Sequence, residues 1–284
     1  MLRTCLALCA ALALTTATAQ GLDGRLKKIA DTKTITIAHR TDAAPFSFVD
    51  ADKNVTGFSV DLCRRVVASL EKQLKVDKLA VKWVPVTTQT RFDAVAKGQA
   101  DLECGASTVT LSRLKTVDFS SFIFIETTGL MAKAVADFKS LADMGGKKIA
   151  VIGGTTNERA VRAQLERRKV NATVVTVKSN EEGIAAVEAG TADAFASDAL
   201  LLIGGAVRAK DPKALALLND RLSYEPYGLV LPRGDYNFRL AVNTALSQIY
   251  SSEQIDDVFS RWFSAFGKPT PLTEAVYILG AIPE

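Results

Sequence analysis

Histidine is nearly absent from this chain of 284 residues, because His39 is the only one. The sequence also contains no CxxC pair, no GxGxxG segment and no GK[ST] segment. A zinc site, a histidine-based catalytic triad, a dinucleotide fingerprint and a phosphate-binding P-loop therefore have almost nothing to be built from. We expect no metal site, no cofactor and no catalytic residue.

Long apolar runs are missing after the first twenty residues, and charge of one sign is not in excess. No later segment reaches the roughly 18 apolar residues that a membrane-spanning helix needs, so we expect a soluble mature protein. The formal net charge is only +4 at pH 7. A charge this small is no footprint of nucleic-acid binding.

The first residues differ in kind from the rest. Arg3 gives a short basic start, residues 6–14 form an apolar run, and small residues precede Ala19. This order predicts a secretory signal peptide over residues 1–19 and a periplasmic location. A retained membrane anchor and a lipoprotein attached through Cys9 are the weaker alternatives.

Removal of that segment leaves two of the four cysteines, Cys63 and Cys104. An exported protein can oxidise such a pair to a disulfide. The alternative is that both are small buried apolar residues, Cys63 on a helix face and Cys104 in a strand.

Short apolar strands alternate with amphipathic helices along the chain. The first series has strands at 34–38, 79–86 and 100–104. One helix is expected from Ser59, which would be its cap, and another over 91–98. The second series begins at 147–154 and runs through helices and strands to 192–197, and a returning strand follows at 225–234. Two helices then follow, and the tail from Gly267 is expected to be extended. This alternation predicts an α/β protein with two parallel blocks and helices on both faces.

Two conspicuous loops follow predicted strands, at 103–113 and 153–158. In open α/β sheets, ligands bind beyond the carboxyl ends of the strands. The two blocks therefore favour two lobes with a ligand cleft between them, lined by these loops.

Arg113 ends the hydroxyl-rich segment "GASTVTLSR". A guanidinium pairs with a carboxylate through two parallel hydrogen bonds and stays charged at any relevant pH. Thr108 and Thr110 can add hydroxyl donors. A surface arginine at a helix start is the alternative interpretation of Arg113.

The segment "IGGTTNERA" predicts a helix that begins at Thr155 or Thr156, because Thr155 and Glu158 have capping-box spacing. Free N–H groups at such a helix start can form an anion site, and a helix start with nothing bound is the alternative. Asp198, at the end of an apolar strand, can either cap the next helix or receive an ammonium group.

Arg40 follows a strand at its carboxyl end. Arg91 lies at a strand-to-helix junction near Thr88. Each of these residues alone is a weak signal, but three arginines, several hydroxyl groups and one carboxylate at strand ends together favour a binding site.

The segments "GFSVDLCRRV", "GQADLECGASTVTLSRLKTVDFS", "GGTT" and "YGLVLPRGD" resemble the periplasmic amino-acid-binding proteins of ABC transporters, solute-binding protein family 3. The similarity covers residues 30 to 266. Within that family, "AHRTDAAPFSF", "ECG" and "DALL" are most similar to the glutamate/aspartate-binding branch.

This resemblance implies a type II periplasmic-binding-protein fold, in which two α/β lobes joined by two hinge strands close on the ligand. Residues 20–129 and 225–284 would form the first lobe, and residues 130–224 the second.

The resemblance also implies a role for each candidate residue. Arg113 would hold the ligand's α-carboxylate with Thr108, Thr155 and Thr156, and Asp198 would receive the α-ammonium group. Arg40, Thr88 and Arg91 would face the side-chain carboxylate. The chain departs from the branch at three positions, which are Ala106, Ile152 and Asn180.

The function implied is a monomeric periplasmic receptor for an acidic L-amino acid, glutamate or aspartate, that delivers it to an inner-membrane ABC permease. An enzyme of the cyclohexadienyl dehydratase type is the alternative, with His39 and Glu103 as its only candidate proton donors. A sensory ligand-binding module is a further alternative.

Overall fold

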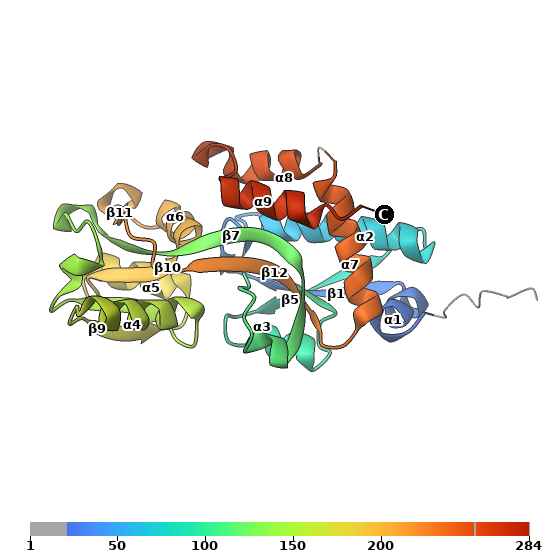
Figure 1. Ribbon diagram of the computed structural model, residues 1–284, viewed down its shortest axis with the longest axis horizontal. Coiled ribbons are helices and arrows are strands. Elements are labelled where there is room, and N and C mark those ends of the chain that lie inside the picture. The colour runs from blue at the N-terminus through green and yellow to red at the C-terminus, as the bar shows by residue number, and fades with distance from the viewer. Residues whose placement is uncertain (1–21, 253, 284) are drawn as a thin grey trace, which may run out of the picture.

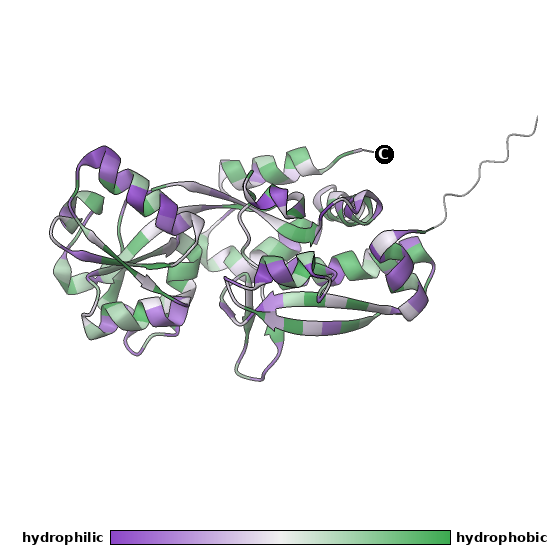
Figure 2. Ribbon diagram, turned by 90° about the horizontal axis from the view of Figure 1, so that it is seen from below, coloured by the Kyte–Doolittle hydropathy of each residue, from purple (hydrophilic) through white to green (hydrophobic). Residues whose placement is uncertain are grey.

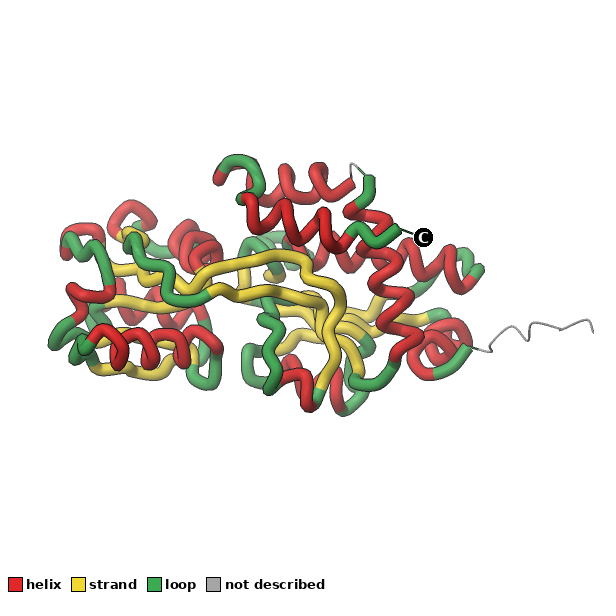
Figure 3. Tube along the Cα trace, in the orientation of Figure 1, coloured by secondary structure: helices red, strands yellow, loops and turns green. Residues whose placement is uncertain are grey.

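A computed structural model describes residues 22–252 and 254–283, so the predicted signal peptide lies outside the described residues. The elements form two groups, and two long strands run from one group into the other (Figure 1). Figure 3 shows these strands as the yellow connection between the groups.

The first half contains the N-terminal and C-terminal parts of the chain. Its elements are α1 (Gly24–Thr32), β1 (Thr34–Arg40), β2 (Asp42–Ala43), β3 (Ser47–Val49), β4 (Val55–Thr56), α2 (Phe58–Leu74), β5 (Ala80–Val86), α3 (Arg91–Ala96), β6 (Leu102–Cys104), α7 (Tyr236–Tyr250), α8 (Gln254–Phe263) and α9 (Pro271–Gly280).

The second half lies between them in the sequence. Its elements are β8 (Lys148–Ile152), α4 (Thr156–Arg168), β9 (Thr173–Val177), α5 (Asn180–Ala189), β10 (Ala194–Asp198), α6 (Ala199–Val207) and β11 (Leu215–Leu217). The strands β7 (Val117–Lys133) and β12 (Tyr224–Pro232) join the two halves.

Each half has a parallel core, as the alternation predicts. In the first half β1 pairs in parallel with β5 and β6, and in the second half β8 pairs in parallel with β9 and β10. The antiparallel strands β7 and β12 complete a sheet in the order β5-β1-β6-β12-β7-β10-β8-β9. The carboxyl ends of the two parallel sets are therefore the edges that can face a common cleft.

The pairing of β7 changes along its length. Its residues from Val117 to Thr127 pair with β12, whereas Thr128 to Ala132 pair with β10. At the change, Glu126 on β7 lies opposite Glu225 on β12. The antiparallel strands β7 and β12 thus form the backbone connection between the two halves near these residues.

Apolar clusters cover both faces of the sheet in each half. In the second half, Val161 and Leu165 of α4 pack on one face, and Ile184 of α5 and Leu202 of α6 belong to the cluster on the other. Figure 2 shows the central strands of this half mostly green, with purple hydrophilic segments on the helices and loops around them. These separate cores let each half hold its own shape.

Cys63 on α2 and Cys104 at the end of β6 form a disulfide, with their Cα atoms 6.4 Å apart. Of the two alternatives open from the sequence, the structure therefore has the bridge. It ties the helix to the strand that leads directly into the loop after residue 104.

Two local expectations are wrong. Ser59 does not cap α2, because the helix already begins at Phe58 after Gly57, and the Ser59 hydroxyl donates instead to the carbonyl of Gly105 at 2.8 Å. The tail is not extended throughout, because α9 forms after Thr270, whose side chain caps it. Burial of Val276 and Tyr277 stabilises this last helix.

Candidate functional site

Most of the predicted site residues lie at or shortly after the carboxyl ends of strands. Arg40 is the last residue of β1, Thr88 follows β5, and Arg91 begins α3. Thr155 caps α4 directly after β8, and Asp198 is the last residue of β10. The topology thus brings residues from both halves to one place.

A single cavity collects seven of the eight predicted residues. Its lining consists of Arg40, Thr88, Arg91, Ala106, Thr108, Ile152, Thr155, Thr156, Asn157, Asn180, Ser197, Asp198 and Leu201. Residues up to 108 come from the first half and the others from the second. The cavity therefore lies between the halves.

The cavity is small, at about 20 Å³. That volume holds about one water molecule. A larger ligand therefore requires the two halves, or the side chains that line the cavity, to move apart. The two connecting strands are the elements that such a movement has to bend.

Arg113 is the predicted residue that does not line this cavity. Its Nη1 donates to the carbonyl of Thr108 at 2.6 Å, and its guanidinium carbon lies 4.7 Å from the ring centre of Phe92. These contacts fix the guanidinium beside the loop that carries Thr108. Burial lowers the pKa of Arg113, and the neighbouring charge of Arg159 lowers it further.

Unused donors gather at the cavity. Within the described residues, the buried side-chain atoms without a hydrogen-bond partner include Nε of Arg40, Oγ1 of Thr88 and Nε of Arg91. Buried polar atoms in proteins are nearly always paired, so each such atom needs an explanation. The three residues line the same cavity, and a ligand bound there can supply acceptors for them.

Arg91 is a buried residue that lines the cavity. Its Nη1 donates to the carbonyl of Ala106 at 2.7 Å. Burial lowers its pKa to about 9, and the positive charge of Arg113 contributes in the same direction. The guanidinium nevertheless stays protonated at neutral pH, so it presents a positive charge to the cavity.

Glu103 is a buried carboxyl group near Arg91, Arg40 and Arg113. Its Oε2 accepts a hydrogen bond from Ser107 at 2.8 Å, while Oε1 has no partner among the described residues. Burial raises its pKa, and the charge of Arg91 opposes that rise. A side chain on Gly105 would collide with this carboxyl group, because an ideal Cβ there lies 2.0 Å from Oε1.

Asp198 occupies the N-cap position of α6 but makes no capping hydrogen bond with its side chain. Tyr227 donates from its hydroxyl group to Oδ2, and Asn157 donates from Nδ2 to Oδ1 at 2.6 Å. Burial raises the pKa of Asp198 to about 7, and the neighbouring Glu225 raises it too. This carboxylate is therefore held in place and buried, and no basic side chain of residues 22–252 and 254–283 lies within salt-bridge distance of it.

More carboxyl groups lie on β7 and β12, at the point where these paired strands pass from one half into the other. Glu225 accepts hydrogen bonds from Thr108 at 2.7 Å and from Thr128 at 3.2 Å. Burial raises the pKa of Glu126 to about 8, with Asp198 adding to the rise. Carboxyl groups are thus gathered near Asp198, whereas the arginines that line the cavity are Arg40 and Arg91.

The helix start at Thr155 is as predicted. Its hydroxyl group accepts from the N–H group of Glu158 at 3.1 Å, and the Glu158 carboxylate accepts from the N–H group of Gly154 at 2.8 Å. Across the cavity, the hydroxyl groups of Thr156 and Thr108 lie 3.4 Å apart. This contact joins the two halves at the cavity.

Sequence reasoning missed three polar residues of the site. Asn157 and Tyr227 hold the Asp198 carboxylate, and Ser197 donates to Asn180 at 3.1 Å. Asn157 is the second residue of α4 and directly follows the predicted helix start. Its position at the cavity could therefore have been predicted from the sequence. Tyr227 lies in the middle of β12 and carried none.

The two proposed proton donors do not line the cavity. His39 is buried beside Trp83, and its Nδ1 lies 3.0 Å from the carbonyl of Arg40. Burial lowers the pKa of His39. Glu103 is the buried carboxyl group near the arginines, as described above. The geometry gives no support to the enzymatic alternative.

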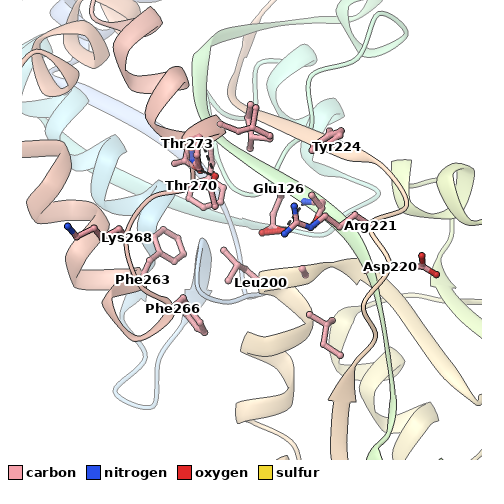
Figure 4. Close-up of a pocket in the computed structure, with 18 of the residues that line it drawn as sticks. Glu126, Leu200, Asp220, Arg221, Tyr224, Phe263, Phe266, Lys268, Thr270 and Thr273 are labelled. Atoms are coloured by element: carbon pink, nitrogen blue, oxygen red, sulfur yellow. Dashed lines mark hydrogen bonds between the residues drawn. The ribbon is translucent and has the colours of Figure 1, made fainter. Parts of the chain in front are cut away.

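A larger cavity, of about 500 Å³, lies elsewhere in the described residues. It lies between the C-terminal helices and the start of α6, and Figure 4 shows Leu200, Phe263 and Phe266 on its walls. Two carboxyl groups, Glu126 and Asp220, line it, and Glu126 accepts from the N–H group of Thr127 at 2.9 Å. None of the eight predicted site residues lines this cavity.

Residues 22–252 and 254–283 contain no cluster of three or more His, Cys, Asp or Glu side chains that could hold a metal ion. In the same part of the chain, no helix combines the length and the apolar character that crossing a membrane requires.

Residues 35–265 match the family model of bacterial extracellular solute-binding proteins, family 3. The chain belongs to this family. The family 3 protein is 36% identical to an L-glutamate/L-aspartate-binding protein of Pseudomonas aeruginosa, over 91% of this chain and 86% of that protein. It is 33% identical to a glutamate/aspartate import solute-binding protein of Escherichia coli, over 91% and 85%.

A solved structure supports the fold of the family 3 protein. The crystal structure of an ancestral amino acid-binding protein, a precursor of cyclohexadienyl dehydratase, superposes with a TM-score of 0.73 at 29% identity, covering 84% of this chain and all of that one. The predicted α/β fold of periplasmic amino-acid-binding proteins is thus confirmed. The chain is a solute-binding protein of a transporter-associated family whose members are generally not enzymes.

Proposed function

We propose that this family 3 protein captures an acidic L-amino acid, glutamate or aspartate, in the periplasm and delivers it to an ABC permease of the inner membrane. The observation that carries the proposal is the set of unused buried donors on Arg40, Thr88 and Arg91. A side-chain carboxylate supplies the acceptors that these donors lack, and two cationic donors favour an anion over an amide. The names of the relatives at 33–36% identity agree with this ligand class.

The remaining groups suit the α-amino acid part of the ligand. Asp198 lines the cavity and is an acceptor for the α-ammonium group. Arg113, Thr108 and the start of α4 at Thr155 and Thr156 supply donors for the α-carboxylate. Micromolar affinity corresponds to about −8 kcal/mol. Several hydrogen bonds to charged groups, at about 1.5–3 kcal/mol each, reach that value after the cost of immobilising the ligand.

The proposal includes the lobe boundaries predicted from the sequence, with residues 20–129 and 225–284 in one lobe and 130–224 in the other. The change of partner along β7 near Thr128 supports this division. Export by a signal peptide over residues 1–19 is part of the same proposal.

Titration calorimetry with glutamate, aspartate, glutamine and arginine tests the ligand class. We expect glutamate or aspartate to bind at micromolar or lower concentration, with glutamine weaker and arginine undetectable, because Arg40 and Arg91 repel a cationic side chain. Tight binding of arginine without binding of the two acids would contradict the role given to these residues.

Closure depends on a close approach between the halves at Gly204. An ideal Cβ on this α6 residue would lie 2.2 Å from the carbonyl oxygen of Ala44 in the first half. We expect Gly204→Ala to weaken glutamate binding about tenfold, because the halves can no longer meet, while the melting temperature holds or rises, since alanine favours a helix over glycine.

Calorimetry and thermal unfolding of the Gly204→Ala variant measure the two effects separately. Gly145→Ala is the matched control, since a Cβ there meets nothing within 4 Å. Wild-type affinity in Gly204→Ala would show that closure does not need this contact.

A further inference from the structure

Asp42 stands between the two halves next to a predicted ligand-binding residue. Nη2 of Arg40 lies 2.5 Å from Oδ1 of Asp42, and the two side chains are only 4% and 10% exposed. Arg40 therefore has a buried counter-ion of its own. None of the roles assigned above to the site residues uses Asp42.

The other oxygen of the same carboxylate reaches the opposite half. The N–H group of Asn180, the first residue of α5, lies 3.3 Å from Oδ2 of Asp42. Nδ2 of Asn180 also lies 3.3 Å from the backbone carbonyl of Asp42. The Asn180 side chain is itself fixed, because its Oδ1 accepts from Ser197. The positive end of the helix dipole adds to the attraction between α5 and this carboxylate.

The nitrogen atoms Nη2 and Nε of the Arg40 guanidinium differ in their partners. Asp42 holds Nη2, whereas Nε is buried without a partner among the described residues. The ion pair therefore fixes the orientation of the group that meets the ligand. It also reduces the net positive charge that a ligand carboxylate experiences there.

We propose that Asp42 is a specificity-determining latch, which positions Arg40, limits the preference for an acidic side chain, and joins this recognition to closure through α5. This inference rests on the proposed function, in which Arg40 meets the ligand's side chain. The negative charge of Asp42 repels a ligand carboxylate but not an amide of the same shape. The contact with Asn180 stabilises closure around either ligand.

Glutamate and glutamine are the matched probes, because they differ in side-chain charge and hardly in size. Asp42→Asn removes the charge and keeps an oxygen acceptor for the N–H group of Asn180. We expect this variant to raise the ratio of glutamate affinity to glutamine affinity about tenfold over the wild-type ratio, as measured by calorimetry. An unchanged or lower ratio overturns the role in specificity.

Asp42→Ala removes the acceptor as well as the charge. Relative to Asp42→Asn, we expect it to weaken both ligands by a similar factor, about threefold to tenfold. Asp50→Asn is the control for a lost aspartate charge, because Asp50 bonds within a surface turn to Asn54. Melting temperatures of all variants establish that they are folded.

The latch is also measurable without ligand. Small-angle X-ray scattering is expected to give a larger radius of gyration for Asp42→Ala than for the wild type, because the closed arrangement loses its link to α5. Equal radii, together with equal effects of the two Asp42 variants on affinity, overturn the latch. A wild-type protein that binds neither probe refutes the proposed function, and the scattering comparison then decides the latch alone.

Discussion

Arg113→Ala is expected to abolish binding of every α-amino acid, with the affinity for glutamate falling at least about a hundredfold. The guanidinium is fixed by its hydrogen bond to the Thr108 carbonyl and by its stacking on Phe92. A fixed fork donates two charge-assisted hydrogen bonds to a carboxylate. Their loss, at about 1.5–3 kcal/mol each, corresponds to two or more powers of ten in affinity.

Calorimetry with glutamate and with glutamine measures this effect, and both ligands should lose affinity equally because both carry the α-carboxylate. Arg167→Ala is the matched control, since Arg167 lies exposed on α4 and bonds only to Gln164. Arg113→Lys keeps the charge without the planar fork, so an intermediate affinity is expected. Micromolar affinity retained in Arg113→Ala would mean that another group holds the α-carboxylate.

The position of Arg113 explains why its role stays a prediction. It lies beside the small cavity and not on its wall, so its contact with a ligand depends on how the halves separate and close. A sequence pattern places it in the right loop. The pattern does not fix its distance from residues of the other half.

The parts of the site that depend on local rules could be predicted from the sequence. Strand ends placed Arg40 and Asp198 at the cavity, because parallel strands of one sheet end at a common edge. Capping-box spacing placed Thr155 at the start of α4. The disulfide was left open, because separation along the chain does not determine whether two cysteines meet.

Contacts between the halves could not be predicted in this way. The bond from Tyr227 to Asp198 and the contact of Asn180 with Asp42 depend on the relative position of elements more than 25 residues apart in sequence. No periodicity or cap encodes that position. The start of α2 was misplaced for a related reason, since the Ser59 hydroxyl group bonds to Gly105, in a distant loop, and not to its own helix.

Asp198→Asn is expected to reduce glutamate affinity at least about a hundredfold, because an amide cannot balance the charge of the α-ammonium group. In the wild type, burial and the neighbouring Glu225 raise the pKa of Asp198 to about 7. A raised pKa means that the carboxyl group becomes protonated as the pH falls below that value. Only the ionised form binds the ammonium group well, so affinity should decrease as the pH falls from about 8 to about 5.

Calorimetry in buffers of different ionisation enthalpy measures both parts of this prediction. Near pH 7, glutamate binding should release a proton, because the ammonium group lowers the pKa of Asp198 in the complex. Asp198→Asn should bind weakly with little dependence on pH across that range. Glu126→Gln is the control for the neighbouring group, whose pKa is about 8, and it should keep the pH dependence. A wild-type affinity that is constant from about pH 5 to 8 would show that Asp198 is not the partner of the ammonium group.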